Sequence, residues 1–365
     1  MERLDGYLIL NSLRLIGPVR VRRLLDAFGS VEKIFLQSAA SLSAVAGIGP
    51  KAAASIRDWE QHFDPAAELA ELRRLKLGVI DREDARYPQQ LLEIYDPPLV
   101  LYYQGDLAAA KRRGIGVVGS RQTSPYGLET AKKLSYQIAY AGLPVVSGLA
   151  RGIDTAAHQG ALAAKGRTVA VLGCSLDLMY PPENQALAEM IVERDGLLLS
   201  EFPLKTPPDK QTFPMRNRIV SGLSGGVLVV EAGADSGALI TARMALDQGR
   251  QVFAVPGRID NPQSKGCHRL IKEGAKLVES VEDILAEFEF LFPKAAISEP
   301  RRTLPADLSA DERVILEHLG LEEVHLDELT RKCGLPSARM SSTLLRLEMR
   351  KLARQLPGKF FVKTD

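Results

Sequence analysis

Short runs rich in valine and isoleucine alternate with helical stretches through the middle of the chain, from residue 82 to residue 292. Two of the intervening stretches, residues 126–141 and 238–248, are long enough for a helical crossover between parallel strands. The candidate strands are residues 114–119, 143–148, 168–173, 197–202, 226–232, 251–257 and 275–280. This alternation predicts an α/β domain with a Rossmann-like, doubly wound and mostly parallel sheet.

The chain before this domain has helical periodicity, with glycines between the helical stretches. Residues 13–30 and 45–56 each contain a Gly-Pro turn, and the second segment resembles a helix-hairpin-helix motif that binds the DNA backbone. We expect a helical amino-terminal domain over residues 1–81, of the helix-hairpin-helix or SAM-like type, with Lys51 as a secondary DNA contact. A helical packing module, in which the glycines only permit tight turns, fits the same sequence.

A third region follows the α/β domain. Residues 293–307 carry prolines and charges without periodicity, which predicts a linker. Residues 308–365 then show the order of helix, turn, helix and terminal hairpin that is typical of a winged helix. Its helix pair would be residues 326–333 and 337–348, and residues 355–363 would form the wing. Acidic residues near the first helix weaken a DNA-reading role, so DNA contact and protein contact both stay open.

The composition indicates where in the cell the protein works, but it says little about which ligand the protein binds. The 365 residues carry a formal net charge of +2 at pH 7, and the three cysteines are widely spaced without a Cys-x-x-Cys pair. This argues against a disulfide framework and offers no zinc motif. The apolar runs are far shorter than the roughly 20 residues of a membrane-spanning helix, and the amino terminus lacks a signal-peptide pattern. We therefore expect a cytoplasmic protein with no membrane partner.

In doubly wound sheets ligands bind beyond the carboxyl ends of the strands, so the following loops are the expected site of function. The loop after the first candidate strand suits a phosphate, because Gly119 permits close approach, Ser120 offers a hydroxyl and Arg121 a guanidinium. A polar loop with a solvated arginine would have the same sequence. The GIGVVG run at residues 114–119 matches a dinucleotide-binding pattern, but its glycines lie inside the strand, which argues against NAD.

Two further loops have similar chemistry. After the second strand, Ser147 and Gly148 give a turn that exposes the backbone, and Arg151 beside them is a secondary contact. Residues 205–224 are the densest segment, because basic side chains surround a phenylalanine, the combination that binds phosphates and stacks on bases of single strands. The candidate contacts there are Lys210, Phe213, Arg216, Asn217 and Arg218. An exposed basic helix start with its phenylalanine in the core is the competing interpretation.

The strand at residues 226–232 leads to a further helix start at the same predicted edge. Ser236 and Gly237 precede this helix and are secondary DNA contacts, although Asp235 or Ser236 fits equally well as a helix cap. Glu231 and Asp235 form a possible carboxylate pair, but no third ligand and no partner base lies near them in the sequence. We therefore expect no catalytic residue, no metal and no cofactor.

Six segments, in their order and spacing, resemble the signature of the DNA-processing protein A (DprA/Smf) family: GSRQTSPYG, SGLARGID, SEFP, FPMRNRIVSGLS, VVEAGADSGALITA and VFAVPG. The resemblance implies a Rossmann-like domain that binds single-stranded DNA and forms a homodimer. It also implies loading of a RecA-type recombinase onto incoming strands during natural transformation, without chemical turnover. Carried onto this sequence, the DNA contacts fall on Ser120, Arg121, Lys210 and Phe213, and the pocket is lined by Gly148, Arg216, Asn217 and Arg218.

Two enzymatic alternatives stand beside this prediction. Related Rossmann-like proteins, the lysine-decarboxylase-like phosphoribohydrolases, cleave nucleotides at an equivalent strand edge and carry a Pro-Gly-Gly-x-Gly-Thr turn followed by a glutamate. The corresponding segment here is EAGADSGALITA, which lacks both features. A nuclease that uses the helix-hairpin-helix segment would need a cluster of metal ligands, and the sequence offers none. A non-enzymatic binder of single-stranded DNA is the leading prediction.

Overall fold

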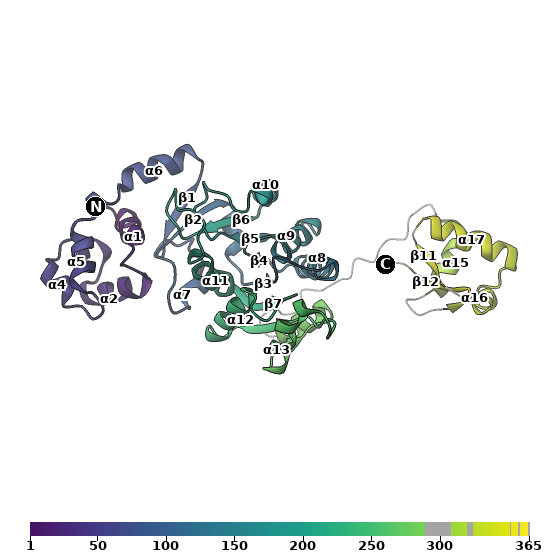
Figure 1. Cartoon of the computed structure of the whole chain (residues 1–365). Coiled ribbons are helices and arrows are strands. Elements are labelled where there is room, and N and C mark those ends of the chain that lie inside the picture. The colour runs from purple at the N-terminus through teal and green to yellow at the C-terminus, as the bar shows by residue number, and fades with distance from the viewer. Residues whose placement is uncertain (289–307, 320–323, 351, 357, 364–365) are drawn as a thin grey trace. The chain divides into compact units, whose positions relative to one another are not determined.

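The computed structural model describes residues 1–288, 308–319, 324–350, 352–356 and 358–363. The chain divides into two compact units, residues 1–293 and 294–365, which are described separately. The first unit holds an amino-terminal helical region and an α/β domain, and the second unit is a small helical domain with a three-stranded sheet (Figure 1).

A nine-stranded sheet forms the centre of the first unit, in the order β1-β2-β6-β5-β4-β3-β7-β8-β9. The strands β3 to β9 pair in parallel, whereas β1 and β2 are antiparallel additions at one edge. The strands are β1 (Gly78–Asp81), β2 (Val100–Gly105), β3 (Gly114–Val118), β4 (Val145–Ser147), β5 (Thr168–Val171), β6 (Leu197–Ser200), β7 (Ser224–Val229), β8 (Gln251–Ala254) and β9 (Lys276–Leu277). All seven predicted strands are present, and the doubly wound, mostly parallel fold is confirmed.

The hydrophobic pattern does not predict β1 and β2. The first of them lies in the range that the pattern assigns to the amino-terminal helical region, and it pairs with β2 from Gly78 opposite Tyr103 to Asp81 opposite Val100. A strand of four residues is too short to show a recognisable period. Its conformation is set by the pairing partner rather than by its own sequence.

Helices cover both faces of the sheet because successive strand residues point to opposite sides. In β3, Ile115 and Val117 pack in one buried cluster, and Val118 packs in another on the opposite face. The first face carries α8 (Pro125–Tyr140), α9 (Ile153–Ala163), α10 (Gln185–Glu193) and α14 (Val281–Leu285), and the second carries α7 (Gln89–Leu92), α11 (Thr212–Gly222), α12 (Ala238–Asp247) and α13 (Lys265–Lys272). Since β3 lies between β4 and β7, the strand order reverses there, and a crevice is expected at its carboxyl end.

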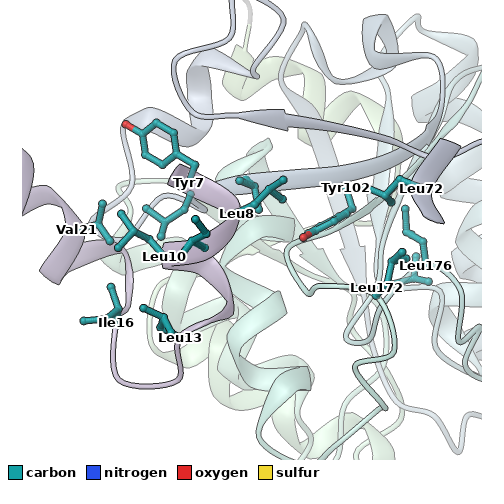
Figure 2. Close-up of a cluster of buried hydrophobic side chains, with 14 of the residues drawn as sticks. Tyr7, Leu8, Leu10, Leu13, Ile16, Val21, Leu72, Tyr102, Leu172 and Leu176 are labelled. Carbon is teal, nitrogen blue, oxygen red and sulfur yellow. The ribbon is translucent and has the colours of Figure 1, made fainter. Parts of the chain in front are cut away.

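Six helices precede the sheet: α1 (Arg3–Ser12), α2 (Pro18–Phe28), α3 (Val31–Phe35), α4 (Ala39–Ser43), α5 (Pro50–Arg57) and α6 (Pro65–Arg74). The two predicted Gly-Pro turns begin α2 and α5, with Gly17 and Gly49 as N-caps and proline at the first helical position, where its fixed φ favours the helix. Figure 2 shows Leu8 of α1 and Leu72 of α6 near Tyr102 of β2, all members of one buried cluster. The amino-terminal helices therefore share a core with the sheet.

The second unit is the predicted winged helix. It contains α15 (Ala310–His318), β10 (Val324–His325), α16 (Leu326–Cys333), α17 (Ser337–Met349), β11 (Ala353–Leu356) and β12 (Phe360–Lys363), with the strands in the order β10-β12-β11. Gly334 ends α16 in the left-handed conformation, with φ of 64°. Ile315, Leu329 and Met340 form the centre of its core. The predicted linker at residues 293–307 lies outside the described residues.

Within the described ranges, no helix is long and apolar enough to cross a membrane.

All three cysteines are free. Burial raises the pKa of the Cys174 thiol to about 11 and that of the Cys267 thiol to about 12. Both thiols are therefore protonated near neutral pH, and the thiolate is the reactive form.

His158 of α9 is completely buried and is a source of acid sensitivity. Its Nδ1 lies 2.7 Å from the hydroxyl of Thr168, and burial, aided by the charge of Arg216, lowers its pKa from 6.5 to about 3. Between these pH values the unfolded chain binds one proton that the folded chain does not, so stability falls as the pH drops through this window. The expected loss from this one group is about 1.4 kcal/mol per pH unit.

We expect His158→Gln to flatten this pH dependence. In urea unfolding, the loss of stability between pH 6.5 and pH 5 should be about 2 kcal/mol smaller than in the unsubstituted protein. His62→Gln is the matched control, because His62 is exposed. An unchanged pH dependence in His158→Gln would show that another group takes up the proton.

Candidate nucleic-acid interface

A cleft of about 820 Å³ opens where the strand order reverses, at the carboxyl ends of β3, β4 and β7. Its walls come from the loops after these strands, the start of α11 and the segment that leads into α13. The fold brings ten of the sequence-predicted residues to this cleft: Gly119, Ser120, Arg121, Gly148, Lys210, Phe213, Arg216, Asn217, Ser236 and Gly237.

The loop after β3 is held tightly against its neighbours. The Ser120 N–H donates to the carbonyl of Glu231 at 2.7 Å, and the Ser120 hydroxyl donates to the carbonyl of Gln122 at 2.6 Å. A side chain at Gly119 has no room, because a Cβ there would lie 2.4 Å from Ile153. Gly119 is thus required by packing, and the Ser120 hydroxyl shapes the loop.

Glu231, just beyond β7, ties this loop to the start of α8. Its carboxylate accepts hydrogen bonds from the Ser124 N–H and hydroxyl, both at 2.8 Å, from the Thr123 hydroxyl, and from Asn261 Nδ2 at 3.1 Å. Burial raises the pKa of Glu231, but these donors outweigh it and hold the pKa below its ordinary value. Among the residues that the structure describes, no three His, Cys, Asp or Glu side chains are grouped to hold a metal ion.

An arginine and a phenylalanine form one wall of the cleft. The guanidinium carbon of Arg121 lies 4.8 Å from the ring centroid of Phe213, within the range of a cation–π contact. Arg121 and Lys210 are exposed, and Phe213 is only partly buried. The interpretation in which Phe213 belongs to the core does not describe this fold, because its ring lines the cleft.

Arg216 lies in the floor of the cleft, where it is buried beside Asp154. Its Nη1 donates to the carbonyl of Gly148 at 2.5 Å and to that of Val171. The carboxylate of Asp154 accepts the N–H groups of Gly148 at 3.0 Å and Ala150 at 3.3 Å. Burial lowers the pKa of Arg216 and raises that of Asp154, and the charge of each group opposes the shift of the other. Together they brace the loop after β4.

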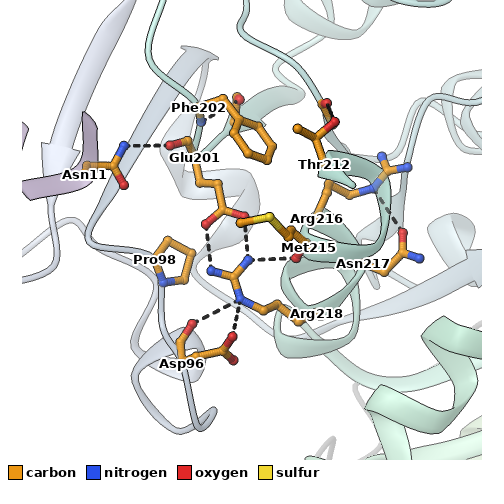
Figure 3. Close-up of polar contacts among 12 residues, drawn as sticks. Asn11, Asp96, Pro98, Glu201, Phe202, Thr212, Met215, Arg216, Asn217 and Arg218 are labelled. Carbon is orange, nitrogen blue, oxygen red and sulfur yellow. Dashed lines mark hydrogen bonds and ion pairs between the residues drawn. The ribbon is translucent and has the colours of Figure 1, made fainter. Parts of the chain in front are cut away.

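Arg218, two residues farther along α11, is not among the residues that line the cleft. Figure 3 shows its contacts with Glu201 and Asp96. Its two terminal nitrogens donate to the carboxylate of Glu201 at 2.5 and 2.6 Å, and its Nε lies 2.9 Å from a carboxylate oxygen of Asp96. Burial lowers the pKa of Arg218, but these two carboxylates outweigh it and raise the pKa above its ordinary value. The charge of Arg218 is neutralised within the fold.

Three other sequence candidates lie outside the cleft lining. Ser147 is buried, and its hydroxyl donates to the carbonyl of Val117 at 2.6 Å. Arg151 is exposed, pairs with Glu183 and lines a smaller cavity of about 420 Å³. Lys51 is exposed on α5 of the amino-terminal region. Their assignment as DNA contacts remains a prediction.

Sequence reasoning missed part of the cleft, the segment after β8. Gln263 and Lys265 both line it, and Lys265 Nζ also donates to the carbonyl of Ile259 at 2.7 Å. A lysine at the start of a helix that follows a strand was the available signal. The exposed charged residues that line the cleft are Arg121, Lys210 and Lys265, against Asp235. Positive charge therefore predominates, and the cleft suits an anion with flat apolar groups.

Comparison with known families identifies all three regions of the chain. Residues 78–289 match the family model described as DNA recombination-mediator protein A. Residues 299–359 match the DprA winged helix domain, and residues 7–58 match the SAM-like helix-hairpin-helix tandem. The winged helix and the helix-hairpin-helix predictions are thereby confirmed as fold assignments.

Similar proteins and structures carry the same family name. Protein Smf of Synechocystis is 34% identical to this chain over 385 residues, which cover 96% of each chain. The solved structure of DprA from Streptococcus pneumoniae is 40% identical with a TM-score of 0.69, and the match covers 78% of this chain and 98% of that chain. DNA processing protein A of Helicobacter pylori, reported for its single-stranded DNA binding mode, is 28% identical with a TM-score of 0.54, covering 60% and 97%. The chain therefore belongs to the DNA-processing protein A (DprA/Smf) family of DNA recombination mediators.

Proposed function

We propose that this recombination mediator binds single-stranded DNA in the cleft at the carboxyl ends of β3, β4 and β7. The observation that carries the proposal is the exposed Arg121 stacked on Phe213 with Lys210 nearby in the same cleft. Phosphates bind guanidinium and ammonium groups, whereas bases stack on aromatic rings, so this combination fits a single strand. The single-stranded DNA binding mode reported for the Helicobacter pylori relative supports it.

The cleft residues divide into contacts and supports. Arg121 and Lys210 contact phosphates, Phe213 stacks on a base, and the backbone at Ser236 and Gly237 adds the positive end of α12. Arg216 and Arg218 stabilise the cleft and do not contact DNA, because their guanidinium groups are bonded to the Gly148 carbonyl and to the Glu201 carboxylate inside the fold. Arg151 and Lys51 extend the binding surface as secondary contacts.

The proposed role includes partners that family membership favours. A homodimer holds the strand, protects it and loads a RecA-type recombinase onto it, in the cytoplasm, during natural transformation or homologous recombination. The protein takes part without chemical turnover and without a metal or cofactor. Recombinase filament formation on the bound strand, followed with the variants below, measures this role directly.

Salt dependence of binding to a labelled oligo-dT tests the cleft. We expect Arg121→Ala and Lys210→Ala each to reduce the slope of log affinity against log salt by about 0.7, the value for one phosphate contact on a single strand. Phe213→Ala should lose about 1 to 3 kcal/mol of binding free energy with little change in slope, since stacking releases no counterions.

Lys111→Ala is the matched control. Lys111 is exposed and precedes β3, at the sheet edge opposite the cleft, so its removal should leave affinity and slope unchanged. If Arg121→Ala and Lys210→Ala behaved like this control, the strand would bind elsewhere on the protein.

The nucleotide-hydrolase alternative has its own test. Incubation of the protein with nucleoside monophosphates and with labelled DNA in the presence of Mg²⁺ should yield no product. A product that depends on the protein and disappears in Arg121→Ala would make the cleft an active site and overturn the non-enzymatic part of the proposal.

A further inference from the structure

A second groove, of about 710 Å³, lies beside α10 and shares no lining residue with the DNA cleft. It is formed by α10, the loop after β5, and residues of β2 and β6. Leu178, Met179 and Val192 give it an accessible apolar surface. A cavity of this kind suits apolar side chains of a ligand.

The charged residues that line this groove are all acidic. Asp177, Glu189 and Glu193 line it, and no lysine, arginine or histidine is among its lining residues. The DNA cleft has the opposite sign, because basic residues predominate there. The groove therefore repels a phosphate backbone and favours a cationic ligand.

The charged residues of α10 lack compensating partners. Glu189 and Glu193 are four residues apart and thus neighbours on one helix face, where like charges destabilise the helix. Glu189 accepts a hydrogen bond from Gln185 Nε2 at 3.2 Å, but in the described part of the chain neither glutamate has an ion-pair partner. Asp177 accepts the backbone N–H of Lys205, at 3.1 and 3.2 Å, and no other hydrogen bond from the residues that the structure describes. A cationic ligand would relieve this repulsion.

We propose that the groove docks a basic, apolar-faced helical segment of a protein partner. Apolar side chains of that segment pack against Leu178 and Val192. Its flanking lysines or arginines pair with Asp177, Glu189 and Glu193. An amphipathic helix in an apolar groove is a common mode of recognition, and the charges set its register and partner choice.

The position of the groove lets a partner meet the bound strand. Tyr180 lines the groove and Phe213 lines the DNA cleft, and their ring centroids are 5.8 Å apart. A partner in the groove would thus lie next to the strand without competing for its contacts. Both ligands bind at the same time.

The test uses the full-length protein and a labelled amphipathic helical peptide with leucines on one face and lysines beside them. We expect salt-sensitive binding of this peptide, and much weaker binding of a matched peptide in which glutamate replaces each lysine. Glu189→Gln with Glu193→Gln should weaken the lysine peptide by up to about fivefold per charge, the upper limit for an exposed ion pair. Val192→Asn should weaken it at every salt concentration.

Two controls separate this proposal from DNA binding. Glu60→Gln removes an exposed carboxylate outside the groove and should leave peptide binding unchanged. Saturating oligo-dT should not displace the peptide, and the Glu189→Gln, Glu193→Gln variant should keep its affinity for DNA. Equal binding of the two peptides, or binding that no groove substitution changes, would overturn the groove proposal and leave the DNA cleft untouched.

Discussion

Arg218→Met is expected to lower the free energy of unfolding by about 3 to 5 kcal/mol, the usual cost of removing one partner from a buried ion pair. The side chains of Arg218 and Glu201 are each only 7% exposed and share two short hydrogen bonds. Without Arg218, the Glu201 carboxylate stays buried with no counterion. Urea unfolding at neutral pH measures the loss.

A second substitution distinguishes this cause from lost packing. The double variant Arg218→Met, Glu201→Leu removes the orphaned charge as well, so it should recover much of the lost stability. Arg74→Met serves as the surface control, because Arg74 is 67% exposed in its pair with Glu71. A loss in Arg218→Met no larger than in Arg74→Met would mean that the buried pair contributes little. At temperatures where Arg218→Met is folded, its slope of log DNA affinity against log salt should equal that of the unsubstituted protein, whereas Arg121→Ala reduces this slope.

Arg216→Met should destabilise the fold by a similar amount, about 3 to 5 kcal/mol, and should also weaken DNA binding. The substitution leaves the buried Asp154 carboxylate without its nearby cation and the Gly148 carbonyl without its donor. The loop after β4 then loses its brace, although Arg216 itself offers no exposed charge to DNA. Unfolding in urea and oligo-dT affinity, measured on the same preparation, report the two effects.

The pH dependence of Arg216→Met identifies Asp154 as the cause. The folded pKa of Asp154 is raised, so above the ordinary pKa of aspartate the folded state holds more protons than the unfolded state, and stability falls as the pH rises. Removal of Arg216 raises the pKa of Asp154 further, so the variant should lose more stability at pH 7 than at pH 4. Asp154→Asn in the same background should abolish that difference. A loss that is independent of pH would assign the effect to the Gly148 and Val171 carbonyls instead.

The two arginines illustrate a limit of sequence reasoning. Arg216 and Arg218 stand in one basic run with Lys210, and the sequence alone makes all three equivalent DNA contacts. The fold buries the two arginines and exposes the lysine. A buried cation needs partners. These are Glu201 after β6, the carbonyl of Gly148 after β4 and the carbonyl of Val171 at the end of β5. The sequence around Arg216 and Arg218 does not show that these carbonyl and carboxylate groups, which are distant along the chain, lie next to α11 in the fold.

The groove beside α10 is a second feature that sequence reasoning does not predict. Asp177, Glu189 and Glu193 are unremarkable along the chain, since acidic residues on a helix and in a loop usually face solvent. Packing of α10 against β6 brings Glu189 and Glu193 next to the loop after β5, which carries Asp177, and the three carboxylates then surround one apolar groove. Lys265 lines the DNA cleft for a comparable reason. β8 pairs in parallel with β7, so the segment after β8 starts at the same edge of the sheet as the loop after β7.

The pattern of residues along the chain is enough to predict the alternation of strands and helices, and hence the doubly wound sheet and the edge at which its loops meet. It could do so because a strand or helix that buries one face imposes a regular period on hydrophobic positions, and because parallel strands bring their carboxyl ends together. The antiparallel strands β1 and β2, the buried state of Arg216 and Arg218, and the second groove follow only from the assembled fold. Each of these depends on partners distant in sequence, and burial and electrostatics are properties of the assembled neighbours rather than of the residue type.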